Sequence, residues 1–150
     1  SGDLLRRFEG HTHHVLSVSW QSSGQTLASA GADGAVKIWN AKDGDQSRSI
    51  GGFTKQVTSL QFIGDTPDIA ATSGDSIVRF IRSTNGGTVR NFGGVAEFMH
   101  CVAVTPDGAV LVGGGHDSIL RIWNGTNGQV LKNLPPPSIR RGGERDDAGK

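Results

Sequence analysis

Cysteine and methionine each occur once in this sequence, and tyrosine does not occur at all. The single cysteine, Cys101, excludes an internal disulfide framework and a zinc site built from several cysteines. It fits a reducing compartment, so a cytoplasmic location is favoured. The only methionine, Met99, is not an initiator, and the residues after Ser1 show no signal-peptide pattern. We therefore expect the chain to be part of a longer polypeptide.

An excess of charge of one sign and long apolar runs are also missing. The 15 lysine and arginine residues nearly balance the 14 aspartate and glutamate residues, which leaves a formal net charge of +1. Such a balance gives no strong field to attract a polyanion. No apolar run approaches the roughly 18 residues that a membrane-spanning helix needs, so we expect no membrane partner.

Glycine, by contrast, is abundant, with 23 of 150 residues, and this abundance predicts a chain with many turns. Many residues recur with a period of 42 residues, as Gly10, Gly52 and Gly94 do. The same step separates aspartates, apolar residues and cations in three further series: Asp33, Asp75 and Asp117; Trp39, Ile81 and Trp123; Lys37, Arg79 and Arg121. Because no gap is needed anywhere, the period indicates three consecutive structural repeats.

The period begins before the first complete repeat. Two series have four members, namely Phe8, Ile50, Phe92 and Leu134, and Arg6, Arg48, Arg90 and Lys132. Residues 2–9 therefore match the end of a repeat whose first three strands are absent from this sequence. We expect them to form an orphan outer strand, which upstream strands would complete into a sheet.

Each period predicts four short β-strands. In the first period, alternating apolar and small polar residues predict a strand at 15–20, and turn residues separate further strands at 27–30, 35–39 and 46–50. Four strands in about 40–45 residues are typical of a propeller blade. The expected fold class is all-β, with three complete β-propeller blades of four antiparallel strands, an extra N-terminal strand and an incomplete ring.

The repeats resemble those of the WD-repeat family over residues 2–134. The first repeat has Gly-His at 10–11, Ala-Asp-Gly at 32–34 and Val-Lys-Ile-Trp-Asn at 36–40. The third repeat keeps Leu-Arg-Ile-Trp-Asn at 120–124, whereas the second has Ile81 in place of the tryptophan. The resemblance implies a propeller whose turns and rim bind other proteins.

The resemblance also implies a structural hydrogen-bond network in each blade, which joins a histidine, a turn aspartate, a hydroxyl residue and a tryptophan. In the first repeat these are His11, Asp33, Ser29 and Trp39. Buried polar groups of this kind must satisfy one another, so the network would lock the turn. The later repeats keep only part of the set, namely Asp75 in the second, and Asp117 and Trp123 in the third.

Other chemistry finds little support. The cluster of His11, His13 and His14 has no cysteine or carboxylate at ligand spacing, so we expect no metal site there. His116-Asp117-Ser118 contains the residue types of a nucleophilic triad, but Asp117 belongs to the repeat, and adjacent residues rarely form such a triad. No phosphate-binding loop or nucleophile elbow occurs. We expect neither catalysis nor a cofactor.

The recurring cations suggest two surfaces. Arg6, Arg48, Arg90 and Lys132 are expected on the outer strands, one per blade, as a rim that could bind a partner. Lys37, Arg79 and Arg121 are expected on the third strand of each blade, with their stems over apolar neighbours. Base-stacking aromatic residues are scarce, so nucleic-acid binding through these cations is the weaker interpretation.

The chain divides into a propeller segment at 1–134 and a tail. The blades are expected at about 10–50, 52–92 and 94–134, and the orphan outer strand at 2–9. The tail at 135–150 begins with three prolines and continues with polar and charged residues, a composition that predicts disorder.

These observations lead to a functional hypothesis of a non-catalytic scaffold for protein–protein interaction. Its partners would be other proteins, together with upstream blades or further copies of the chain that complete the ring. An alternative is an accessory propeller of a larger enzyme or redox protein, because the repeats also resemble bacterial proteins in which WD repeats follow a c-type cytochrome domain. That arrangement would place the chain in the cell envelope, although no haem-attachment motif occurs here.

Overall fold

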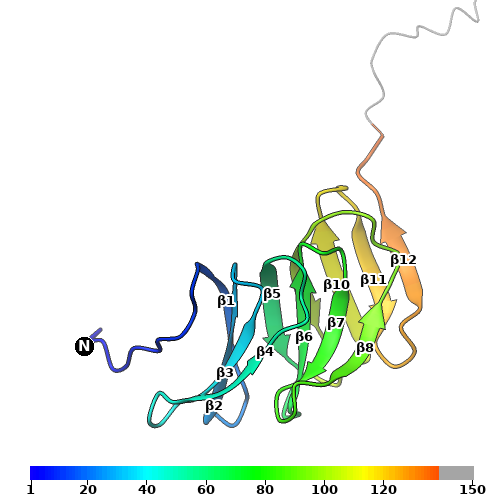
Figure 1. The fold of residues 1–150 in the computed structure, drawn as a ribbon. Coiled ribbons are helices and arrows are strands. Elements are labelled where there is room, and N and C mark those ends of the chain that lie inside the picture. Colours follow the sequence, from blue (N-terminus) through cyan, green and yellow to red (C-terminus); the bar gives the residue numbers. More distant parts are fainter. Residues whose placement is uncertain (139–150) are drawn as a thin grey trace, which may run out of the picture.

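The computed structural model of the chain contains three four-stranded antiparallel sheets, one for each complete repeat (Figure 1). The structure describes residues 1–138. Blade 1 comprises β1–β4, blade 2 β5–β8 and blade 3 β9–β12, and within each blade the strands follow one another in sequence order. The strands are β1 (Val15–Trp20), β2 (Thr26–Gly31), β3 (Val36–Asn40), β4 (Gln46–Ile50), β5 (Val57–Phe62), β6 (Asp68–Ser73), β7 (Val78–Arg82), β8 (Thr88–Phe92), β9 (Met99–Val104), β10 (Val110–Gly115), β11 (Leu120–Asn124) and β12 (Val130–Leu134).

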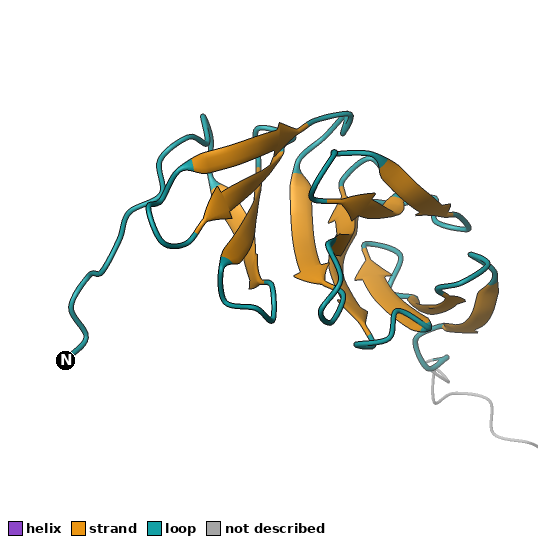
Figure 2. Ribbon diagram, turned by 90° about the horizontal axis from the view of Figure 1, so that it is seen from below, coloured by secondary structure: helices purple, strands orange, loops and turns teal. Residues whose placement is uncertain are grey.

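The three sheets stand side by side in an open row and do not close into a ring (Figure 2). The all-β fold class and the incomplete ring of three blades are confirmed. Neighbouring blades pack face to face, because each sheet has apolar residues on both of its faces. The first interface buries Ala28, Ile38, Leu60 and Phe62, and the second buries Phe80, Phe92, Met99 and Trp123.

Side chains also join the first strands of neighbouring blades, which form the inner edge of the row. The backbone N–H groups of Leu60 and Phe62 on β5 donate to the hydroxyl oxygens of Ser17 and Ser19 on β1, each at 3.1 Å. The backbone N–H of Val104 on β9 donates to Oε1 of Gln61 on β5, also at 3.1 Å. Backbone N–H groups at the edge of blades 2 and 3, which have no strand beside them, are thus satisfied by side chains of the preceding blade.

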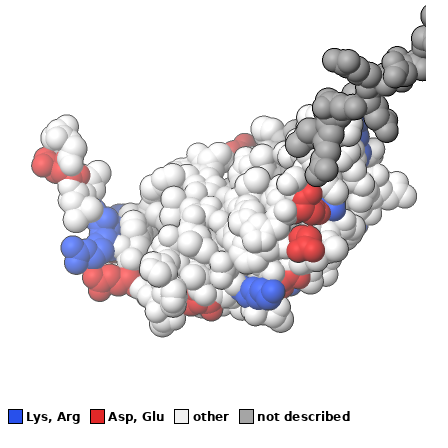
Figure 3. Space-filling model, turned by 90° about the horizontal axis from the view of Figure 1, so that it is seen from above, with Lys and Arg blue, Asp and Glu red and all other residues white. Residues whose placement is uncertain are grey.

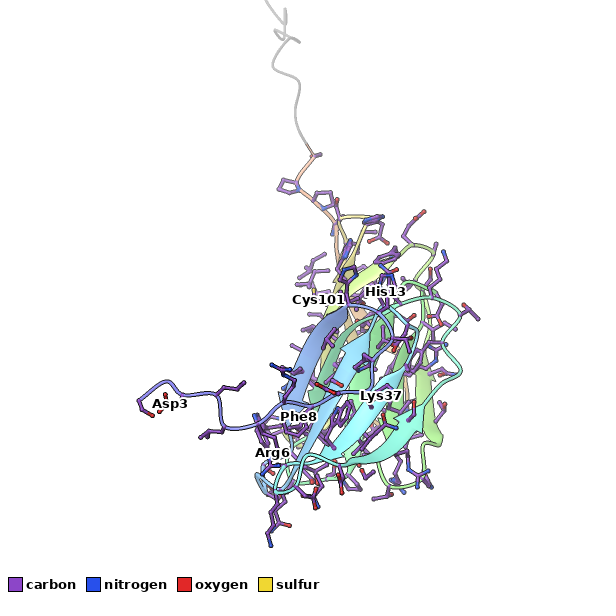
Figure 4. The ribbon with its side chains drawn as sticks, turned by 60° about the vertical axis from the view of Figure 1, so that its left-hand side comes forward. Asp3, Arg6, Phe8, His13, Lys37 and Cys101 are labelled. Carbon is purple, nitrogen blue, oxygen red and sulfur yellow. The ribbon has the colours of Figure 1, made fainter. Side chains whose placement is uncertain are left out.

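Residues 2–9 do not form the orphan strand that the repeat register predicts. A strand needs a hydrogen-bonded neighbour, and no such strand is present beside this segment in the described chain. The end of the segment, at Arg6 and Phe8, nevertheless packs on blade 1, whereas Asp3 lies away from it (Figure 4). The ring of Phe8 meets that of Trp39 edge-on at 5.7 Å between centroids, and Nη1 of Arg6 donates to the carbonyl oxygen of Asp43 at 2.6 Å.

The position of Phe8 matches that of its repeat equivalents. Phe92 of β8 meets Trp123 of the next blade edge-on, with centroids 6.3 Å apart, as Phe8 meets Trp39. The end of the N-terminal segment therefore lies where the outer strand of a preceding blade would lie. At the other end, residues 135–138 follow β12 without forming a strand, and residues 139–150 of the tail lie outside the described part of the chain.

The turn between the second and third strands of each blade requires one residue with positive φ. Blade 1 has Gly34 there, with φ of 73°, whereas blades 2 and 3 have Ser76 and Ser118, with φ of 67° and 60°. This left-handed conformation costs a residue with a Cβ atom about 1–2 kcal/mol, which glycine avoids. Blades 2 and 3 therefore carry a local strain that blade 1 lacks.

Replacement of Ser76 or Ser118 by glycine should stabilise the chain. We expect each substitution to raise the free energy of unfolding by about 0.5–1 kcal/mol, because the relief of strain exceeds the entropy that glycine adds to the unfolded chain. Urea denaturation of the two single variants would measure this change. The reverse substitution, Gly34→Ser, should destabilise blade 1, and a neutral result for all three would contradict the strain argument.

Candidate functional site

The structure brings together the four residues that the resemblance assigns to the network of blade 1. The Nδ1 atom of His11, which precedes β1, lies 2.9 Å from Oδ2 of Asp33 in the turn after β2. Its Nε2 atom lies 2.7 Å from the hydroxyl of Ser29 on β2, which also accepts the indole N–H of Trp39 at 2.8 Å. One continuous chain of hydrogen bonds therefore links the entry loop, the turn and two strands.

The carboxylate of Asp33 is held in its charged form by this arrangement. Burial acts to raise the pKa of Asp33, but the hydrogen bonds from His11 and from the backbone of Thr12 and Ala35 outweigh it, and the pKa lies below its ordinary value. Buried hydrogen-bonded groups of this kind specify one turn conformation. The network is thus a structural feature of the turn, and its histidine also lines a pocket of about 420 Å³ together with Thr12, His13 and His14.

In blade 2 an ion pair stabilises the equivalent turn, which follows β6. Asp75 occupies the position of Asp33, and its Oδ2 atom accepts from Nη2 of Arg79 at 2.8 Å while Oδ1 accepts from Nη1 at 3.3 Å. The guanidinium group of Arg79 lies 4.6 Å from the centre of the ring of Phe53, which replaces the histidine. Burial acts to raise the pKa of Asp75, but the bonds from Arg79 more than compensate and lower it.

Blade 3 also uses an ion pair, between Asp117 and Arg121, with Oδ2 and Nη2 at 2.6 Å. The hydrogen bond from Arg121 lowers the pKa of Asp117, and burial opposes this only in part. Trp123 donates its indole N–H to the carbonyl oxygen of Gly93 at 2.9 Å, so it is not joined to Asp117. A hydroxyl side chain in place of Gly113 would require Met99 to move, because a Cβ atom there would lie 2.8 Å from Cε of Met99.

The partners of Asp75 and Asp117 were missed in the sequence, although the signal was present. In both repeats the arginine follows the aspartate by four residues, and the turn brings the two side chains together. Lys37, at the same position in blade 1, instead donates from Nζ to Oε1 of Gln46 at 3.0 Å. All three cations are buried, so they are not available to nucleic acid.

The rim cations behave differently. The stem of each arginine packs over a glycine in the last turn of the following blade: Arg6 over Gly44, Arg48 over Gly86 and Arg90 over Gly128. Arg6 and Arg48 are exposed, Arg90 is half-buried, and Lys132 is exposed on β12. The structure therefore places Arg48, Arg90 and Lys132 on the outer strands of blades 1, 2 and 3, and Arg6 on the N-terminal segment.

No group of three or more histidine, cysteine, aspartate and glutamate residues that could hold a metal ion occurs between residues 1 and 138. Nor does this part of the chain contain a helix that is long and apolar enough to cross a membrane. The exposed Cys101 is a free thiol.

The three sheets, their repeated turns and the tryptophan of blades 1 and 3 define a repeat protein of the propeller type. A family model for the WD domain, G-beta repeat, matches residues 2–40 and 87–124, slightly more than half of the chain. The chain therefore belongs to the WD-repeat family. Its members are in general non-catalytic scaffolds for protein interaction.

Curated relatives match over single repeats. The chain is 46% identical over 39 residues to nucleoporin SEH1 of Saccharomyces cerevisiae, a match that covers 26% of this chain and 11% of the relative. It is 36% identical over 44 residues to the probable cytosolic iron-sulfur protein assembly protein Ciao1 of Anopheles gambiae, with 29% of this chain and 13% of the relative covered. It is 43% identical over 37 residues to cell division cycle 20.1, cofactor of APC complex, of Arabidopsis thaliana, covering 25% and 8%. The chain thus spans a small fraction of each of these relatives.

Substitution of Ser29 by alanine should break the network of blade 1. The variant leaves the indole N–H of Trp39 and one imidazole nitrogen of His11 without a partner, and a buried unsatisfied group costs about 1–3 kcal/mol. Thermal or urea denaturation would measure the loss. The exposed Ser23 provides the matched control, because Ser23→Ala should change the stability by less than about 0.5 kcal/mol. Equal effects of the two variants would show that the network contributes nothing.

The stability of the fold should fall at acidic pH. The pKa values of Asp33, Asp75 and Asp117 are lower in the folded chain than their ordinary values. Their contribution to stability is therefore complete above the ordinary aspartate pKa and is lost as the pH falls through the lower folded values. Urea midpoints measured against pH should drop less steeply for Asp75→Asn than for the unmodified chain. Asp3→Asn, on the exposed N-terminal segment, is the control and should keep the original slope.

Proposed function

We propose that this chain is a non-catalytic scaffold for protein–protein interaction, and that its two end blades are binding surfaces for further polypeptide. The observation that carries the proposal is the exposure of apolar side chains at the ends of the row. Their repeat equivalents within the row are buried. Large exposed apolar surfaces on a folded protein are typical of interaction sites.

The open face of blade 1 shows this most clearly. Val18 and Trp20 on β1 are 66% and 57% exposed, whereas their equivalents Leu60 and Phe62 on β5 are each 5% exposed. The difference arises because blade 1 covers the face of blade 2, whereas no sheet covers the same face of blade 1 and the N-terminal segment reaches only its outer part, beside Trp39. Beside Trp20, the open face is hollowed by a groove of about 700 Å³ that Trp39 also lines.

The opposite face of blade 3 is open as well. Leu120 on β11 is 43% exposed, whereas Val78, its equivalent on β7, is fully buried against blade 3. The two open faces are the two halves of an interface that the chain already forms twice, between blades 1 and 2 and between blades 2 and 3. A blade that carries these repeats therefore fits either end.

The partners that fit best are protein surfaces of the same kind, provided either by upstream blades or by further copies of the chain. The N-terminal segment bears on this choice, because Phe8 already lies at the outer-strand position beside Trp39. A complete blade from a second copy would bring its own outer strand to the same place. Upstream strands that use residues 2–9 as their outer strand would not conflict with it.

Family membership supports the proposal, and the charge distribution does not favour nucleic acid. Two relatives of the chain are named as a nucleoporin and as a cofactor of the APC complex, and both names refer to protein assemblies. The face of the propeller seen in Figure 3 has few lysine and arginine side chains and no continuous basic patch. Three of the seven phased cations are buried as well.

Association through the open faces can be tested with two variants. We expect sedimentation velocity to show concentration-dependent association of the chain, and Val18→Asp or Ile122→Asp to weaken it at least about tenfold by placing a charge on one open face. A mixture of the two variants keeps one intact pair of faces and should associate again. Val89→Asp, on the exposed side of the outer strand β8, is the control.

A variant that lacks residues 1–9 tests whether the partner is a set of upstream strands or a further copy of the chain. Its self-association should be stronger than that of the whole chain, because the outer-strand position on blade 1 is then free for a second copy. If neither chain associates at any accessible concentration and both stay folded, the open faces are not binding surfaces and the proposal is wrong.

A further inference from the structure

Blade 3 carries three ring side chains at positions where the other blades carry different residues. Phe98 precedes β9, His100 lies on β9, and His116 lies in the turn after β10. The repeat equivalents of His100 are Leu16 and Thr58, and those of His116 are Ala32 and Gly74. Both imidazoles are exposed, so the packing of the fold does not require them. Their presence needs another explanation.

The three rings form one compact group. The ring centroids of His100 and His116 lie 4.6 Å apart, and those of Phe98 and His116 lie 5.3 Å apart with nearly parallel planes, at 27°. The ring centroids of Phe98 and His100 lie 5.0 Å apart. The aromatic ring thus supports both imidazoles on one side.

The backbone holds this group in place. The N–H of His116 donates to the carbonyl oxygen of Phe98 at 2.9 Å, which ties the turn after β10 to the start of β9. The ring of Phe98 packs directly on Gly74 in the equivalent turn of blade 2, where any side chain would collide with it. The rings therefore rest on two blades, and the imidazoles are more restricted than histidines on a free loop.

The rings face a cavity of about 530 Å³ that all three blades line. Leu16 of blade 1 and Gln56 and Thr58 of blade 2 complete its wall. The hydroxyl of Thr58 lies 2.8 Å from the carbonyl oxygen of Met99 and 3.1 Å from the hydroxyl of Thr72, so it is already held by hydrogen bonds within the wall. The cavity combines two imidazoles with two neutral oxygen-bearing side chains.

We infer that His100 and His116 bind a divalent transition-metal ion of the class that prefers imidazole, such as Cu²⁺, Ni²⁺ or Zn²⁺. A metal–nitrogen bond of about 2.0–2.1 Å places each ring centroid about 3.2 Å from the ion, so adjacent imidazole ligands have centroids about 4.5–5.2 Å apart. The observed 4.6 Å lies in this range. Water, with the side-chain amide of Gln56, would supply the remaining ligands within the cavity.

A second histidine pair provides an internal comparison. His13 and His14 have ring centroids 4.5 Å apart, but they are consecutive residues on an exposed loop. The Nδ1 atom of His13 already accepts the backbone N–H of His14 at 2.9 Å. No phenylalanine ring supports this pair among the described aromatic contacts. We therefore place the proposed metal site at His100 and His116 and not at His13 and His14.

The repeat supplies substitutions that should leave the fold intact. His100→Thr introduces the residue of blade 2 at this position, and His116→Ala introduces the residue of blade 1. We expect the whole chain to bind one equivalent of Cu²⁺, measured by titration calorimetry, with electron paramagnetic resonance showing two coordinated imidazole nitrogens. Each single variant should lower the affinity at least about tenfold and leave one coordinated nitrogen. The double variant should remove the site.

His13→Ala/His14→Ala is the matched control and should keep the affinity of the unmodified chain within about twofold, with both nitrogen signals. Titrations with Zn²⁺ should rank the variants in the same order of affinity as Cu²⁺ does, and each affinity should be lower than for Cu²⁺. Circular dichroism confirms that each variant is folded. Unchanged Cu²⁺ binding in the double variant His100→Thr/His116→Ala, or loss of binding in the control, would overturn the assignment.

Discussion

Each blade has two apolar faces, and neither can be buried within the blade itself. A four-stranded sheet of this size needs a second sheet to cover its apolar faces. The contact between neighbouring blades is therefore the interaction on which the stability and the open ends of the row depend. Blade 2 is covered on both sides, and its central strand β6 is buried from Ile69 to Ser73. Blades 1 and 3 are each covered on one side only. The repeat therefore determines the fold and also leaves the same kind of surface at each end.

The turn after the second strand of each blade is stabilised by two different kinds of interaction within this one chain. Blade 1 uses neutral and charged hydrogen-bonding groups that end on the indole of Trp39, whereas blades 2 and 3 use a buried aspartate–arginine pair. The two arginine pairs are not equivalent. Arg79 has the ring of Phe53 beneath it, whereas Nε and Nη1 of Arg121 have no hydrogen-bond partner among the described residues. The ion pair of blade 3 is therefore less well satisfied than that of blade 2.

Much of this fold could be predicted from the sequence, because a gapless period carries long-range information that single strands lack. The strand at 15–20 and the strand at 46–50 agree with β1 and β4, and the four residues around Ser29 meet as the resemblance implies. The Asp75–Arg79 pair is not predicted, because the four-residue spacing is visible in the sequence but only the folded turn shows that the two side chains meet. The strand expected at 2–9 is absent, because strand formation depends on a neighbouring chain that the sequence of the segment does not contain. The rings of Phe98, His100 and His116 are also separated in sequence, and only the pairing of β9 with β10 brings them together.

The hydrogen bonds between the inner strands give the row a direction. Ser17 and Ser19 on β1, and then Gln61 on β5, offer oxygen atoms to the backbone of the blade that follows. The equivalent residues on β9 are Cys101 and Ala103, and neither offers an oxygen acceptor. A sheet docked on that side of blade 3 would be held by apolar packing without these bonds. Under mechanical load, a longer array would therefore separate first at the interface between blade 3 and the sheet docked on it. The interfaces between blades 1, 2 and 3 would stay intact.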